Sequence, residues 1–202
     1  MESNKKNALF IQRVGAFILD IIIVSIISSL LYSPFVKTES IDKLNKQASD
    51  VAEKYMAGKT NINTYLNQSM DISYEMSRIS GVSTIIQIAI LILYFIVFQF
   101  YNKGQTLGKK LMKIMVINSD EDNELTMNNF IIRSLIINSI FINMVILGFT
   151  IFAGKDIYFF AVAIFEGLEY LIIIISAFMM IFSSDGKGIH DRLAHTRVVR
   201  IG

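Results

Sequence analysis

Three carboxylate side chains, Asp20, Glu166 and Glu169, stand within long apolar stretches of the sequence, where an ionised group needs a partner or a purpose. With a helical rise of about 1.5 Å per residue, Asp20 would lie about 15 Å from one end of its stretch, and the two glutamates about 12 and 16 Å from one end of theirs. Glu166 and Glu169 are close enough along a helix to share one face. If these stretches cross a membrane, all three acids lie near its midplane.

Two interpretations of these acids remain open. In the first, the acids are hydrogen-bonded, some of them while protonated, and specify how the helices pack. Their partners would be polar side chains of the same stretches, namely Gln87, Tyr94, Asn138 and Asn143. In the second, Asp20, Glu166 and Glu169 form an ion or proton site, at which a monovalent cation displaces a shared proton.

Arg13 and Arg133 each stand about one helical turn inside an apolar stretch, so their guanidinium groups can reach the headgroup region. Near the C-terminus, His190 and Asp191 are adjacent and therefore cannot hold one metal from a single helix face. We expect no metal site and no catalytic residue there, and favour a structural role in which Asp191 pairs with Arg13 or Arg133. The absence of cysteine from the sequence excludes disulfides and thiol chemistry.

The segment from Gly104 to Lys110 invites comparison with a phosphate-binding P-loop, but the comparison fails. Only three residues separate Gly104 from Gly108, and Lys110 stands where a serine or threonine should bind magnesium. The segment is better interpreted as a tight turn, with Lys109 and Lys110 facing anionic lipid headgroups.

The elements that must position these groups are four apolar blocks, each long enough to cross about 30 Å of hydrocarbon. The chain of 202 residues is 53% hydrophobic, and its mean hydropathy is +0.51. We predict a single all-α domain over residues 1–202, a four-helix transmembrane bundle with spans at about residues 9–32, 82–101, 130–152 and 158–182. A net charge of +2 gives no support to nucleic-acid binding.

The distribution of lysine and arginine places both ends of the chain in the cytoplasm, because the short connections on that side carry most of the positive charge. The long connection at residues 37–80 would then lie outside, and its apolar residues recur at helical spacing. It predicts one or two amphipathic helices that either cap the bundle or form a docking surface for a protein or lipid headgroups. Residues 113–118 and 196–201 have strand-like composition and can pair as a small cytoplasmic sheet.

Several segments, taken in order, resemble the RDD family of bacterial membrane proteins. The resemblance rests on the residues from Arg13 to Asp20, the segment 104–116, Leu125 and Thr126 ahead of Arg133, and the segment 187–199, which includes Asp191 and Arg192. It implies that Arg13, Asp20 and Asp191 are the arginine and two aspartates for which the family is named. The connection at 37–80 is longer than the family's usual one, His195 replaces a small glycine, and Glu166 and Glu169 lie outside the family signature.

The resemblance implies two functions, because some family members are implicated in sodium/proton exchange and others look like accessory partners of membrane enzymes. Our first hypothesis is a cell-membrane protein related to transport, with Na⁺ or K⁺ exchanged for H⁺ at the acids. Four helices are few for a carrier, so this hypothesis predicts a homo-oligomer. The alternative is a non-catalytic accessory or regulatory subunit that binds another membrane protein. Neither hypothesis calls for a cofactor or makes the chain an enzyme.

Overall fold

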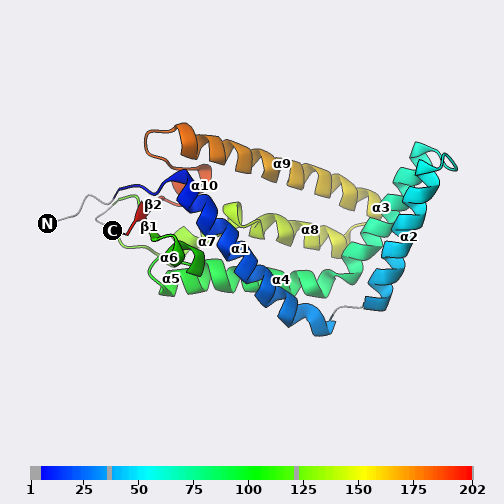
Figure 1. The fold of residues 1–202 in the computed structure, drawn as a ribbon, viewed down its shortest axis with the longest axis horizontal. Coiled ribbons are helices and arrows are strands. Elements are labelled where there is room, and N and C mark those ends of the chain that lie inside the picture. The colour runs from blue at the N-terminus through cyan, green and yellow to red at the C-terminus, as the bar shows by residue number, and fades with distance from the viewer. Residues whose placement is uncertain (1–5, 36–37, 121–122, 202) are drawn as a thin grey trace.

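The computed structural model describes residues 6–35, 38–120 and 123–201. Four long helical segments run roughly along the longest axis, and a helical hairpin lies across one end of them (Figure 1). A two-stranded sheet and two short helices occupy the opposite end. We call these the hairpin end, formed by residues 38–79, and the sheet end, formed by residues 6–8, 102–118 and 183–201.

Three of the four predicted spans are confirmed as helices long and apolar enough to cross a membrane. They are α1 (Phe10–Tyr32) with the 3₁₀ turn η1 (Ser33–Phe35), the helix made of α4 (Gly81–Ile92), η2 (Leu93–Phe98) and α5 (Gln99–Tyr101), and α9 (Lys155–Phe182). Much of their apolar surface faces outward, as on Ile22, Leu30 and Ile174. This exposure is expected where lipid, rather than protein, is the neighbour.

The predicted span over residues 130–152 is not one straight helix, because two helices meet there at a bend of 63°. Helix α7 (Met127–Ile137) stops at Asn138, and α8 (Ile140–Phe152) starts after Ser139, whose φ of 57° is left-handed. The Asn143 side chain donates to the Ser139 carbonyl at 2.7 Å. The same carbonyl also accepts from the Asn143 backbone amide at 2.9 Å, so Asn143 bonds to the first turn of α8 twice.

The helix that begins with α4 contains a π-helical segment, η2, in its second half. Such segments widen the helix locally and often occur at functional sites. Here Tyr94 and Phe95 are buried, and the Phe95 carbonyl accepts a hydrogen bond from Ser134 of α7 at 3.2 Å. The segment therefore directs the Tyr94 side chain into the interior of the sheet end.

The predicted sheet is confirmed: β1 (Ile114–Asn118) pairs antiparallel with β2 (Thr196–Arg200), with Val116 opposite Val198. The chain ahead of α1 extends the sheet, because the Ala8 amide donates to the Val198 carbonyl at 2.9 Å. Ile114, Val116 and Val198 of the two strands pack in one core with Phe130 of α7, and these four side chains are almost fully buried. The sheet thus joins the start, the middle and the end of the chain.

The predicted amphipathic helices at residues 37–80 are confirmed as α2 (Thr38–Met56) and α3 (Ile62–Ile79), although residue 37 lies outside the described part of the chain. Tyr55 stacks on Tyr65 with ring centroids 4.7 Å apart. The hairpin meets the bundle at the start of α9, where the Tyr74 hydroxyl donates to the Ala153 carbonyl at 2.6 Å. It therefore lies across the ends of the spans, as a cap does (Figure 1).

Candidate functional site

Asp191 lies at the centre of a buried ion-pair network at the sheet end. It belongs to the short helix α10 (Ile189–Leu193) and is completely buried. One carboxylate oxygen accepts from Arg13 at 2.8 Å and from the Gly188 amide at 3.1 Å, and the other pairs with Arg133. Arg133 also donates to the Thr196 hydroxyl at 3.1 Å. Asp191 thus pairs with both arginines that the sequence offered as alternatives, and connects α1, α7 and α10.

The charges around Asp191 fix its ionisation and that of its neighbour. Burial acts to raise the pKa of Asp191, but the charges of Arg133 and Arg13 outweigh it and hold that pKa well below its usual range. Burial, with the charge of Arg133 nearby, lowers the pKa of His190 to about 3. His190 is therefore neutral, with Nδ1 3.0 Å from the Ser176 hydroxyl and Nε2 3.6 Å from Asp191. This arrangement favours the tautomer whose proton is on Nε2, toward the carboxylate.

Asp20 occupies a second buried polar cluster, between α1 and the short helix α6 (Leu107–Leu111). Its carboxylate accepts from the Tyr94 hydroxyl at 2.6 Å, the Thr106 hydroxyl at 2.5 Å and the Gly108 amide at 2.8 Å. Three donors satisfy most of the hydrogen-bonding capacity of one carboxylate. Tyr94 is one of the partners that the sequence suggested for the acids, whereas Thr106 and Gly108 were not foreseen.

The turn from Gly104 to Gly108 has a sequence suited to this contact. Gly104 has a φ of +83°, a conformation that glycine adopts without strain. Thr106 caps the start of α6, where its side chain accepts from the Lys109 amide. A Cβ atom at Gly108 would lie 2.2 Å from the Ala16 carbonyl oxygen and 2.8 Å from an Asp20 oxygen. Only glycine lets α6 approach α1 closely enough for its backbone amide to reach Asp20.

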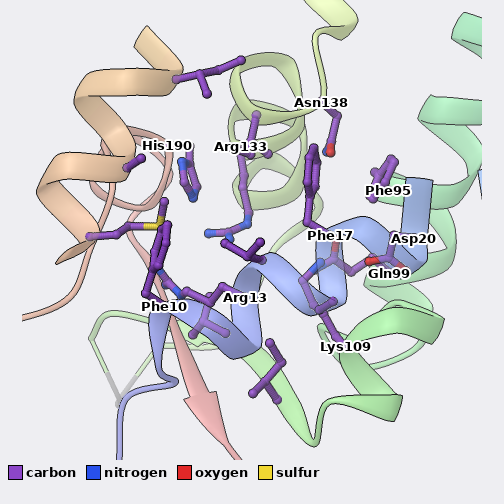
Figure 2. Close-up of a pocket in the computed structure, with 18 residues that line it drawn as sticks. Phe10, Arg13, Phe17, Asp20, Phe95, Gln99, Lys109, Arg133, Asn138 and His190 are labelled. Carbon is purple, nitrogen blue, oxygen red and sulfur yellow. The ribbon is translucent and has the colours of Figure 1, made fainter. Parts of the chain in front are cut away.

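A cavity of about 190 Å³ separates the two clusters. Arg13, Lys109 and Arg133 contribute cationic groups to its lining, Asp20 contributes a carboxylate, and most of the remaining lining is apolar. Figure 2 shows Arg13 of α1 and Arg133 of α7 directed toward the space between these two helices and α9. The cavity therefore has cationic groups within a largely apolar wall.

The two lysines expected at lipid headgroups differ in their surroundings. Lys110 is exposed, as headgroup contact requires. Lys109 is only partly exposed, lines the cavity, and places its ammonium 3.4 Å from the Thr106 hydroxyl. Burial, together with the charge of Arg133, lowers the pKa of Lys109 to about 7. Lys109 is thus part of the site rather than of the surface.

The structure does not bring Asp20, Glu166 and Glu169 together. Glu169 accepts a hydrogen bond from Ser139 at the bend between α7 and α8, and Glu166 is exposed on α9. Within residues 6–35, 38–120 and 123–201, no group of three or more histidine, cysteine or acidic side chains is placed to hold a metal ion. Each acid has its own surroundings. The three carboxylates, which we expected at one depth, therefore do not form one site.

One further side chain takes part in the site although sequence reasoning passed over it, and one that was expected there does not. Ser176 of α9 accepts from the Ile189 amide at 3.1 Å and so fixes α10 against the bundle. A lone serine in an apolar helix does not by itself predict a role. Its contact with His190 is seen only once α9 and α10 are packed together. Arg192, expected at the same face, makes an exposed pair with Asp185 at 2.9 Å and stays outside the network.

Comparison with known proteins gives one match. The model of the RDD family matches residues 7–195, which is nearly the whole chain. The matched range includes Arg13, Asp20, Arg133 and Asp191, the charged residues of the two clusters. No curated protein and no solved structure matches the chain.

Proposed function

The chain belongs to the RDD family, and we propose that it crosses the cell membrane four times with both ends in the cytoplasm. Three helices are long and apolar enough to span, and the bent pair α7 and α8 supplies a fourth span if it counts as one. An even number of spans agrees with the arrangement in which residues 6–8 and β2 lie in one sheet. The sheet end would then be the cytoplasmic end, with the lysines around α6 near the headgroups.

We further propose that the protein is a non-catalytic binding protein of the accessory class, which holds an anionic ligand in the cavity between its two polar clusters. The observation that carries this proposal is the balance of charge around the cavity. Three cationic side chains of the lining are opposed by Asp20, whose oxygens already accept three hydrogen bonds, and by Asp191, which pairs with the two arginines. A site with an excess of positive charge attracts anions and repels Na⁺ and K⁺.

Cation/proton exchange is the second candidate, and a single observation favours it. Asp20 is a buried carboxylate on a span and borders the cavity, so protons or cations could reach it from there. The positions of Glu166 and Glu169 count against it, because an exchange site built from several carboxylates requires them to face one ion.

An exchange assay separates the two candidates. Purified protein is reconstituted into vesicles that contain a pH-sensitive dye, and Na⁺ or K⁺ is added outside. We expect no proton movement beyond that of protein-free vesicles. Exchange that is present in the native protein and lost in Asp20→Asn would show that the cavity serves cations and would overturn the proposal.

Binding is tested on the same preparation by thermal unfolding in an uncharged detergent. We expect inorganic phosphate or a phosphate-bearing lipid to raise the melting temperature of the native protein. Lys109→Gln should reduce this increase, whereas Lys110→Gln should leave it intact, because only Lys109 lines the cavity. A melting temperature that responds to neither kind of anion would contradict the proposal.

A further inference from the structure

The cavity opens toward the lateral surface of the bundle between α1 and α9. Phe17 of α1 and Ile173 of α9 belong to the cavity lining, and yet 38% and 37% of their surfaces are exposed on the outside. Resting on the proposed function, we propose that the ligand is an anionic membrane lipid, whose phosphate-bearing headgroup occupies the cavity and whose tails leave between α1 and α9.

The charges of the site leave room for one negative group. With Lys109 protonated, the positive charges of Arg13, Arg133 and Lys109 are opposed by the carboxylates of Asp20 and Asp191, so one positive charge has no counterpart within the set. Uncompensated charge inside a region of low dielectric constant is costly. A phosphate diester carries a single negative charge and would balance the set.

The hydrogen-bonding groups of the site point to the same kind of ligand. Arg13 uses its two terminal nitrogens on Asp191 and on the Gly186 carbonyl, and its Nε is a buried donor without a partner in the described residues. Asn138 and Gln99 add amide groups to the lining. Phosphate oxygens accept hydrogen bonds from arginine and amide donors, whereas the apolar side chains of the wall have no atoms that can accept them.

The apolar part of the lining suits the rest of a lipid. Phe10 and Phe17 of α1 and Ile173, Ala177 and Met180 of α9 all belong to the cavity lining. The cavity of about 190 Å³ accommodates a phosphate and part of a glycerol, but not acyl chains as well. A lipid fits a cavity of this size because its tails remain in the bilayer. A free phosphate, in contrast, would bring no apolar group to contact the apolar wall.

Tryptophan fluorescence can test the inference, since the native chain contains no tryptophan. Phe17→Trp places a reporter at the opening, and Phe178→Trp places a matched reporter on α9 at a residue that is 58% exposed and lies outside the cavity lining. Each variant is reconstituted in phosphatidylcholine vesicles that contain a minority of phosphatidylglycerol with brominated acyl chains, which quench nearby tryptophan.

We expect phosphatidylglycerol to quench Phe17→Trp beyond its share of the vesicle lipid, and to quench Phe178→Trp only in proportion to that share. Adding Lys109→Gln to Phe17→Trp should weaken the preference about fivefold, which corresponds to about 1 kcal/mol for one lysine near an anionic headgroup. Adding Lys110→Gln instead should leave the preference unchanged. Circular dichroism of each variant confirms that the helices remain.

Proportional quenching of Phe17→Trp would overturn the lipid assignment. If inorganic phosphate still raised the melting temperature in that case, the ligand would be a soluble phosphate, and the proposed anion-binding function would stand. If neither phosphate nor phosphatidylglycerol had any effect, the binding function and the lipid assignment would both fail.

Discussion

The sheet end and the hairpin end of the molecule are held together in different ways. At the sheet end, and in the parts of α1 and α7 that adjoin it, charged and polar groups are buried and bonded to one another around Asp20 and Asp191. At the hairpin end, α2 and α3 form an amphipathic pair, whose described polar links to the start of α9 are the Tyr74 hydrogen bond and an exposed ion pair between Lys155 and Asp71.

This difference shows where substitutions should matter most. A buried polar group that loses its partner keeps the full cost of leaving water, whereas an exposed group regains water as a partner. The sheet end also closes contacts between residues far apart in sequence, since Arg13 and Asp191 stand at opposite ends of the chain. We therefore expect the sheet end to determine whether the chain folds, and the hairpin end to contribute small, separable increments.

Asp191→Asn should produce the largest effect, because it leaves Arg13 and Arg133 buried beside a neutral amide. Removing one partner of a buried ion pair costs about 3–5 kcal/mol. We expect the free energy of unfolding to fall by a similar amount, so that the midpoint of denaturant unfolding, followed by circular dichroism in mixed micelles, moves to a lower concentration. Alternatively, the variant is too unstable to be produced.

Asp185→Asn is the matched control for this substitution. Asp185 pairs with Arg192, and the two side chains are 37% and 46% exposed. Exposed pairs contribute about 0–1 kcal/mol, so Asp185→Asn should change the midpoint little. Equal losses in Asp185→Asn and Asp191→Asn would remove the contrast between buried and exposed charge on which the comparison rests.

Gly108→Ala should have the next largest effect. The added Cβ would meet the Ala16 carbonyl at 2.2 Å, which is backbone and cannot turn aside. Overpacking of this kind costs about 1–3 kcal/mol and would also pull α6 away from Asp20. Gly167→Ala is the control, because no atom lies within 4 Å of the added Cβ. A helical glycine at an open position should instead gain about 0.5–1 kcal/mol as alanine.

Much of the fold could be predicted from the sequence, because long apolar blocks and short strand-like segments leave few alternatives in a membrane. The bend at Ser139 could not be predicted in this way. Asn138 and Ser139 interrupt an otherwise apolar block, and such residues also occur within unbroken spans. The structure adds that Ser139, whose φ of 57° marks the bend, donates a hydrogen bond to Glu169 on another helix.

The site was predicted in part. The pairing of Asp191 with an arginine followed from the need of each buried charge for a partner. The role of Asp20 did not, because depth along a helix gives the level of a residue but not the direction in which it faces. Asp20 faces α6, Glu169 faces the bend, and Glu166 faces outward. Rotation about the helix axis, set by tertiary packing, separates residues that share one level.

The pH dependence of stability can show whether the charge of Lys109 opposes folding. In the native protein its pKa is lowered from 10.5 to about 7. Between these values the unfolded chain binds a proton that the folded chain does not, so the free energy of unfolding should rise with pH across this window. Lys109→Met should weaken the rise and raise the melting temperature at pH below about 7, where the native side chain is charged.

The measurement uses lipid-free protein in an uncharged detergent, because a bound anion would favour the charged lysine. Lys110→Met is the control, since Lys110 is exposed. It should keep the same rise as the native protein. If the free energy of unfolding of Lys109→Met rose with pH as much as that of the native protein, the rise would come from other groups. That result would argue against an excess of positive charge in the cavity.

Tyr74→Phe should have the smallest effect and tests the hairpin end directly. It removes the hydroxyl that donates to the Ala153 carbonyl at 2.6 Å, which links α3 to the chain just ahead of α9. A single hydrogen bond of this kind contributes about 0.5–1.5 kcal/mol.

Tyr65→Phe, which keeps the stacking on Tyr55, serves as the control within the hairpin. We expect Tyr74→Phe to increase amide hydrogen exchange in α2 and α3 while exchange in β1 and β2 stays unchanged. Increased exchange at both ends would mean that the hairpin and the sheet unfold as one unit, because a local loss would then have spread along the whole length of the spans.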